Sequence, residues 1–471
     1  MSPLILRRML CGFVACLTLG ASSLAQDALP QPLSLTAAVD FAAKNYPAIR
    51  SSQARADAAR AGVDVARAAY LPRLDLLWQE NRATRNNVFG LLLPQPVIPS
   101  ISGPALGAPS YASAWGSAGG ALLSWEPFDF GLRRANIDAG RALERQAIAG
   151  IGVTQIDTTV AVADAFLSVL AADQAVQAAQ ANLDRLEVFS TSVHALVANE
   201  LRPGADASRV EAELAVGKIQ LIQARQGADV GRATLAEALG VGQALLSIDA
   251  GPLLDLPADN PLPVSKFDVH PLALAQAASI EAAHARAHAL DRSYFPRFNF
   301  QSAYFGRGTG ARLDGRLESD GGLAPDVPNW AVGLTVTFPV FDIWAIQARR
   351  HIEAANETAE HARYDQTLLS LNAGEARARA ILKAARQVSE NTPVQLKAAR
   401  ETETRSRARY QANLATVVEV AEAEKLLAQA EADDALARLA VWRALLGIGR
   451  VHGDLKPFLQ QVAATPVSRR K

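Results

Sequence analysis

The chain has 471 residues, with 47 Lys and Arg against 47 Asp and Glu, so its formal net charge is zero. A neutral chain without a block of basic residues lacks the electrostatic footprint of a nucleic-acid-binding protein. Its two cysteines, Cys11 and Cys16, both lie in an N-terminal apolar segment. The rest of the chain therefore has no thiol or disulfide chemistry.

Residues 1–25 are predicted to be a signal peptide. A pair of arginines precedes the apolar stretch 9–19, and Ala25 ends a small-x-small cleavage site. The alternative is lipoprotein-type cleavage, which would acylate Cys16. Beyond this segment we expect no stretch long and apolar enough for a transmembrane helix, which argues against a helical inner-membrane protein. A β-barrel remains open, because its strands are short and only alternately apolar.

The rest of the chain reads as two copies of one unit. Tyr-Leu-Pro-Arg-Leu at 70–74 ends an Ala-rich helical stretch, and Tyr-Phe-Pro-Arg-Phe at 294–298 ends a second one. Pro-Phe-Asp at 127–129 is matched by Pro-Val-Phe-Asp at 339–342. We therefore expect four segments after the signal peptide: a first helix–strand–strand–helix repeat (26–248), a linker (249–268), a second repeat (269–449) and a C-terminal tail (450–471).

Each repeat contains a very long predicted helix. No proline occurs between Leu132 and Val197, which at 1.5 Å per residue allows a rod of roughly 100 Å. A rod of this length must pack along its side, in a coiled coil or a helical barrel. Pro393 is predicted to interrupt the matching helix of the second repeat and to kink it.

Four β-strands, two per repeat, are predicted between the helices. From Trp330 to Phe338, large apolar side chains alternate with small or polar ones. The other three strands surround Leu74, Leu123 and Phe298. Four strands cannot close a barrel, and open edges are not tolerated in lipid, so several chains must contribute to one barrel. Aromatic residues expected to form its girdle are Trp78, Trp125, Trp330, Phe338, Phe298 and Trp344.

In the order and duplication of these motifs the chain resembles the TolC-type outer-membrane efflux proteins. The resemblance implies an α+β membrane protein: a homotrimer whose twelve strands form one transmembrane β-barrel in outer-membrane lipid, continued by an α-helical barrel across the periplasm. It also implies a passive channel without cofactor or enzyme activity. A periplasmic adaptor and an inner-membrane pump of the RND or ABC type would supply the substrate, in efflux or type I secretion. The alternative is a periplasmic coiled-coil protein without a pore.

The resemblance places an entrance at the two periplasmic tips, where the long helices turn back. Rings of carboxylates at a narrow mouth favour cations. The alternative is that these acids only stabilise the starts of their own helices. The acidic candidates are Asp206, Glu419 and Glu422, and the basic ones are Arg202 and Arg209. The residues expected at the tip turns are Leu201, Gly204, Asn413 and Leu414.

Motifs for catalysis are weak. His284 and His288 have the spacing of metal ligands on a helix, but no general base follows His284 and no third ligand is placed, so we expect a surface pair. The sequence does not identify the cargo. It also leaves open whether the apolar segment 88–110 caps the barrel or packs on its wall.

Overall fold

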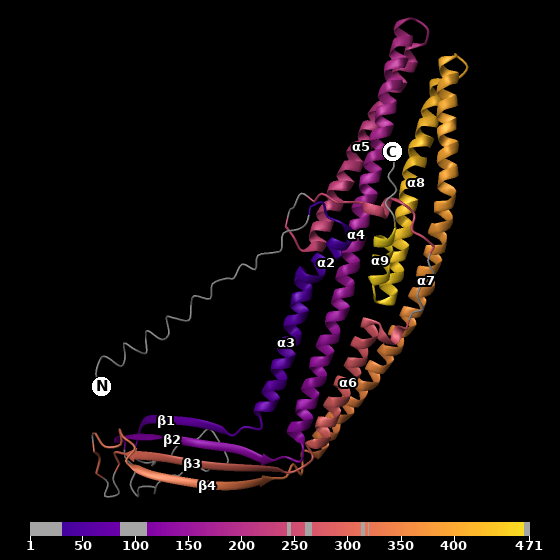
Figure 1. Ribbon diagram of the computed structural model, residues 1–471. Helices are drawn as coiled ribbons and strands as arrows, with labels where there is room; N and C mark the ends of the chain where they lie inside the picture. The colour runs from indigo at the N-terminus through magenta and orange to yellow at the C-terminus, as the bar shows by residue number, and fades with distance from the viewer. Residues whose placement is uncertain are drawn as a thin grey trace.

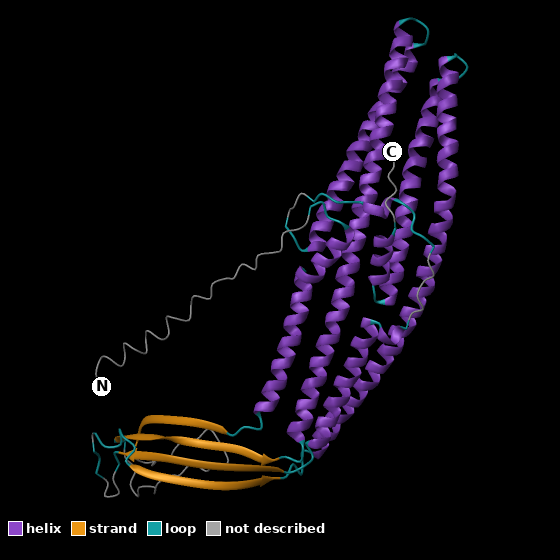
Figure 2. Ribbon diagram, in the orientation of Figure 1, coloured by secondary structure: helices purple, strands orange, loops and turns teal. Residues whose placement is uncertain are grey.

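The computed structural model describes residues 31–84, 111–242, 246–259, 266–311, 316–318 and 320–465. The predicted signal peptide and the apolar segment 88–110 lie outside the described residues. Long helices run side by side in one elongated bundle, and a sheet lies at one end of it (Figures 1 and 2). The α-helices are α2 (Leu35–Asn45), α3 (Pro47–Ala68), α4 (Leu132–Ala198), α5 (Gly204–Leu239), α6 (Pro271–Arg292), α7 (Ile343–Gln411), α8 (Val417–His452) and α9 (Lys456–Ala464). The short 3₁₀ helices are η1 (Gly251–Leu254) and η2 (Phe267–Val269).

The long helices form a wall one helix thick. In the half next to the sheet, the helices contact one another in the order α3, α4, α6 and α7, and in the other half in the order α5, α4, α8 and α7. Helices α4 and α7 run through both halves, with 67 and 69 residues. The rod predicted from Leu132 onward is confirmed. The edges of the wall are α3 and α5 on one side and α7 on the other.

The predicted interruption at Pro393 is wrong. Helix α7 continues through this residue. A proline inside a helix removes one backbone hydrogen bond, but α7 is fastened to α8 on both sides of it. Thr392 Oγ1 donates to Asp434 Oδ1 at 3.2 Å, and Gln395 Nε2 donates to Asp433 Oδ2 at 3.3 Å. These contacts hold α7 against α8 on both sides of the proline.

The expectation that no stretch after the signal peptide is apolar enough to cross a membrane is also wrong, as judged by length and composition alone. Helix α4 contains an 18-residue window with a mean hydropathy of 1.4, of which 44% is buried inside the chain. Phe166, Val169 and Leu170 of this helix lie in the main core, against α2 and α8. Burial between neighbouring helices accounts for part of this apolar sequence.

All four predicted strands are present, as β1 (Arg73–Thr84), β2 (Ser113–Phe128), β3 (Arg297–Thr309) and β4 (Val327–Thr337). They form one antiparallel sheet in the order β1-β2-β3-β4. The outer edges of β1 and β4 carry no further strand in the described part of the chain. Such edges cannot face lipid unpaired, so the sheet requires strands from other chains.

The two faces of the sheet differ. On one face, large apolar side chains point outward without cover: Leu76, Trp78 and Trp330 are 79%, 67% and 77% exposed. The opposite face carries a small buried cluster that includes Leu122 and Phe305. The aromatics form two levels, because Trp78 pairs with Gly119 of β2, which is six residues, or about 20 Å along the strand, from Trp125. Trp125, Phe298, Phe338 and Trp344 lie toward the helices.

The two motifs that define the repeats meet where β2 enters α4. Asp129 accepts hydrogen bonds from the backbone N–H of Gly131 at 3.2 Å and of Arg133 at 2.6 Å, and from Arg133 Nε at 2.9 Å. The guanidinium of Arg133 also lies over the Tyr70 ring, 4.7 Å from its centroid. Trp125 Nε1 donates to the Tyr70 carbonyl. These contacts fix the angle between wall and sheet.

A collar of short elements packs on one side of the wall, near its middle. It consists of α2, η1 and α9, whose apolar side chains join the main core. Trp442 of α8 is fully buried there; its Nε1 donates to the Asp255 carbonyl at 2.9 Å, and its ring meets Phe458 of α9 edge to face.

Candidate functional site at the hairpin tips

The two helical hairpins, α4–α5 and α7–α8, end side by side at the extremity of the molecule farthest from the sheet (Figure 1). Each tip turns through one residue with positive φ, Glu200 (60°) in the first and Asn413 (64°) in the second. The two residues are separated by the same offset as Asp129 and Asp342, so they are equivalent positions of the two repeats. The predicted turn residues Leu201, Gly204, Asn413 and Leu414 lie at or next to these turns.

The second tip is closed by its own side chains. Thr416 is the N-cap of α8 and accepts from the Glu419 backbone N–H at 3.3 Å, while Glu419 Oε1 accepts from the Thr416 backbone N–H at 3.2 Å. This reciprocal pair is a capping box, which satisfies two free N–H groups at a helix start. Glu419 therefore serves its own helix, and both Glu419 and Glu422 are exposed at the tip.

The first tip instead reaches across to the second hairpin. Tyr410, near the end of α7, is only 1% exposed. The Arg202 guanidinium lies 4.2 Å from the centroid of its ring, and Arg202 Nη2 donates to the Tyr410 carbonyl at 2.6 Å. The Tyr410 hydroxyl donates to Asp206 Oδ2 at 3.4 Å. Burial, followed by the Asp206 carboxylate, raises the pKa of Tyr410, so its hydroxyl remains a donor.

Two of the predicted site residues, Arg202 and Asp206, thus both contact Tyr410. The sequence analysis did not single out Tyr410. Phe189 of α4 completes the contact, with its ring edge to face with Tyr410 at 5.4 Å. Arg209 is exposed on α5.

A second link between the hairpins was also missed by the sequence reasoning. Glu424 of α8 has a side chain only 1% exposed. Its carboxylate pairs with Arg185 of α4 at 3.1 Å and, at closer range, with Arg407 of α7. Arg185 also contacts Glu431 at 3.0 Å, and Arg407 lies 3.0 Å from Glu403. The result is a partly buried chain of alternating charges that joins three helices, with Glu424 at its buried centre.

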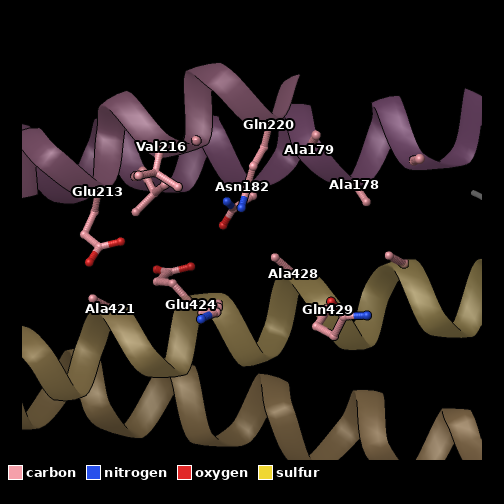
Figure 3. A pocket seen from close by; sticks show the side chains of 15 residues that line it. Ala178, Ala179, Asn182, Glu213, Val216, Gln220, Ala421, Glu424, Ala428 and Gln429 are labelled. Atoms are coloured by element: carbon pink, nitrogen blue, oxygen red, sulfur yellow. The ribbon is translucent and has the colours of Figure 1, made fainter. Parts of the chain in front are cut away.

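Burial raises the pKa of Glu424 above its ordinary value; the Glu403 carboxylate adds to this effect and the Arg407 guanidinium opposes it. Glu424 also lines a groove of about 340 Å³ between the two hairpins. In Figure 3 the side chains of Glu213, Asn182 and Glu424, from α5, α4 and α8, point into this space. Asn182 Oδ1 is buried there without a hydrogen-bond partner among the described residues. The groove is thus a polar seam between the hairpins.

The histidine pair does not form a metal site. His284 Nδ1 lies 3.2 Å from Glu357 Oε1, and the His284 side chain is 70% exposed. Among the described residues, no group of three His, Cys, Asp or Glu side chains is placed to hold a metal ion.

Comparison with known proteins identifies the family. The sequence pattern of the family described as "Outer membrane efflux protein" matches residues 38–241 and 270–453, which covers both repeats. The chain belongs to the outer membrane efflux protein family. Protein CyaE of Bordetella pertussis is 27% identical over 363 residues, which cover 75% of this chain and 70% of CyaE.

Solved structures of outer-membrane channels share the fold. The channel OprN is 22% identical, with a TM-score of 0.70 and 89% of each chain covered. CusC is 16% identical, with a TM-score of 0.72, and covers 92% of this chain and 96% of its own. The MtrE channel of Neisseria gonorrhoeae is 19% identical, with a TM-score of 0.69 and 89% of each chain covered.

Family and fold together settle the main alternatives. The protein is a non-enzymatic efflux channel of the outer membrane, and its helical wall lies in the periplasm. Its four strands form a barrel only together with those of two other chains. The poreless coiled-coil alternative is therefore wrong. The similarity to these family members implies that the chain forms a trimer and works with efflux machinery.

Proposed function

We propose that this channel is the passive outer-membrane conduit of a tripartite efflux or type I secretion assembly. A periplasmic adaptor and an inner-membrane pump of the RND or ABC type would deliver the substrate to the hairpin tips. The observation that carries the proposal is the tip contact itself: Arg202 and Asp206 of one hairpin hold Tyr410 of the other. A contact made by so few polar groups can be released by a partner at modest cost.

At the other end, the exposed apolar face of the sheet contacts outer-membrane lipid. Trp78 and Trp330 would anchor one level of the barrel, and Trp125, Phe298, Phe338 and Trp344 the level near the helices. Indole rings favour the interface between hydrocarbon and headgroups.

The exposed acids of the second tip line the entrance in this proposal. Three chains place Glu419 and Glu422 around one narrow mouth, where grouped carboxylates retain multivalent cations. In planar-bilayer recordings, hexamminecobalt(III) is expected to block the wild-type channel, and the Glu419→Ala/Glu422→Ala double variant is expected to relieve the block about tenfold or more.

The matched control is Glu390→Ala, which removes an exposed acid of α7 far from the tip and should leave the block unchanged. Equal block in the wild type and the double variant would show that these acids do not line the entrance. The conduit role has a separate test: photo-cross-linking from Leu201 or Leu414, both exposed, should capture an adaptor protein. Capture of no periplasmic protein at either tip would contradict that role.

A further inference from the structure

A second groove lies near the middle of the wall, between α7 and α8 and beside α4. It has a volume of about 850 Å³. Its floor is apolar: Leu439 and Ala444 are buried, whereas Ile381 and Leu436 lie in it with 59% and 40% of their surface exposed. Exposed aliphatic side chains inside a concave site offer a surface for an apolar ligand.

Three arginines line this apolar floor: Arg377 from α7, and Arg443 and Arg450 from α8. Arg443 is neutralised, since its Nε lies 2.9 Å from Asp164 Oδ1 and its Nη2 donates to Ser168 Oγ at 2.7 Å. The guanidinium groups of Arg377 and Arg450 have no ion pair or hydrogen bond within the described part of the chain. The unpaired guanidinium groups of Arg377 and Arg450 thus border the apolar floor of the groove.

The groove opens on the side of the wall away from the collar. Ala440 and Gly447, seven residues apart on α8, line the groove. Trp442 points instead toward η1 and α9, and on a helix it lies more than 120° around the axis from both of them. The collar and the groove thus lie on opposite sides of α8, so with the collar on the outside of a tunnel the groove faces the lumen.

We propose that this groove binds an amphipathic organic anion, a carboxylate or sulfonate on an aliphatic or aromatic body, from the tunnel lumen. The guanidinium groups of Arg377 and Arg450 hold the acid head, because the planar fork of Arg matches the two oxygens of such a group. The apolar body lies on Ile381 and Leu436. The wall thus offers an anion site between the acidic mouth and the barrel.

Calorimetric titration of the intact trimer in lipid nanodiscs tests the proposal without adaptor or pump, so its outcome is separate from that of the conduit role. Naphthalene sulfonate is the probe. The wild type is expected to bind it, and Arg377→Gln/Arg450→Gln is expected to weaken binding about tenfold or more, since both charge-assisted contacts are lost. Leu436→Gln, which keeps both arginines, should weaken it about threefold through the lost apolar contact.

The control is Arg379→Gln, on the same helix as Arg377 but paired with Glu375 and outside the groove; its affinity should equal that of the wild type. Inorganic sulfate should bind far more weakly than naphthalene sulfonate. Equal affinity in the wild type and the double variant overturns the site. Equal binding of sulfate and naphthalene sulfonate overturns its amphipathic character.

Discussion

The two hairpin tips occupy equivalent positions of the repeat but are held in different ways. In the second tip, Thr416 and Glu419 cap their own helix. In the first, the equivalent residues are Pro203 and Asp206. Proline has no hydroxyl, so no capping box forms, and the Asp206 carboxylate instead accepts from a tyrosine of the other hairpin. The two tips thus share the shape of the turn. Whether residue 203 or 416 carries a hydroxyl determines whether the acid three residues later caps its own helix or binds the other hairpin.

A second equivalent pair shows the same divergence one turn further along. Glu211 on α5 lies 3.3 Å from His194, and its side chain is 62% exposed. Its counterpart Glu424 is buried between Arg185 and Arg407. The first hairpin therefore contributes Arg185 to this link, and the second contributes both the buried acid and Arg407. Because the two hairpins differ at this position, an ion pair between Arg185 and Glu424 can join them.

The largest effect that tests this asymmetry is expected at Tyr410. Tyr410→Ala removes the ring on which Arg202 lies and leaves a cavity beside Phe189, at a cost of roughly 4 kcal/mol in the free energy of local opening. Hydrogen exchange of the amides at the end of α7 reports this opening, and single-channel conductance should rise. The equivalent change in the first hairpin is Val197→Ala, which deletes two methyl groups of a half-buried side chain and should cost roughly 1 kcal/mol. Similar exchange in the two variants would mean that the tips are not asymmetric.

An intermediate effect is expected in the partly buried charge chain. Glu424→Ala leaves Arg185 and Arg407 without their shared partner, and removing one member of a buried ion pair destabilises by roughly 3 kcal/mol. Glu211→Ala, at the equivalent exposed position, should change stability by less than about 0.5 kcal/mol. Urea denaturation of the two variants at matched protein concentration measures the difference. A Glu211→Ala variant as unstable as Glu424→Ala would show that burial does not distinguish the two acids.

Local patterns predicted much of the fold. The period of two in the strands and the absence of proline in α4 are properties of short windows, and they located four strands and one rod correctly. The Pro-Phe-Asp motif at 127–129 marked the true start of a helix, because the Asp129 side chain satisfies the first N–H groups of α4. Such features depend on single side chains or short windows of residues, so they can be predicted from the sequence.

The candidate site was predicted only in part, because its contacts join residues far apart in the chain. Tyr410 lies some 200 positions from Arg202, and nothing in its own surroundings shows that it is buried. The role of Glu424 depends equally on Arg185, which belongs to another repeat. The error at Pro393 has the same origin, since the contacts that hold α7 against α8 on both sides of the proline are not visible in the sequence of α7.

The smallest effect concerns the caps, and it tests whether proline at one position sets the difference between the tips. Thr416→Ala removes the capping box and should cost about 1 kcal/mol in the local stability of the second tip. Pro203→Ser introduces a cap at the equivalent position, and its hydroxyl can accept from the Asp206 N–H, as Thr416 does from Glu419. If Asp206 then turns to its own helix in a reciprocal box, the Tyr410 hydroxyl loses its acceptor and the tip contact weakens.

Hydrogen exchange should therefore slow at the start of α5 and quicken around Tyr410 in the same variant. Slower exchange at both places would show that Asp206 serves its own helix without leaving Tyr410, and that the asymmetry of the tips rests on Arg202 alone.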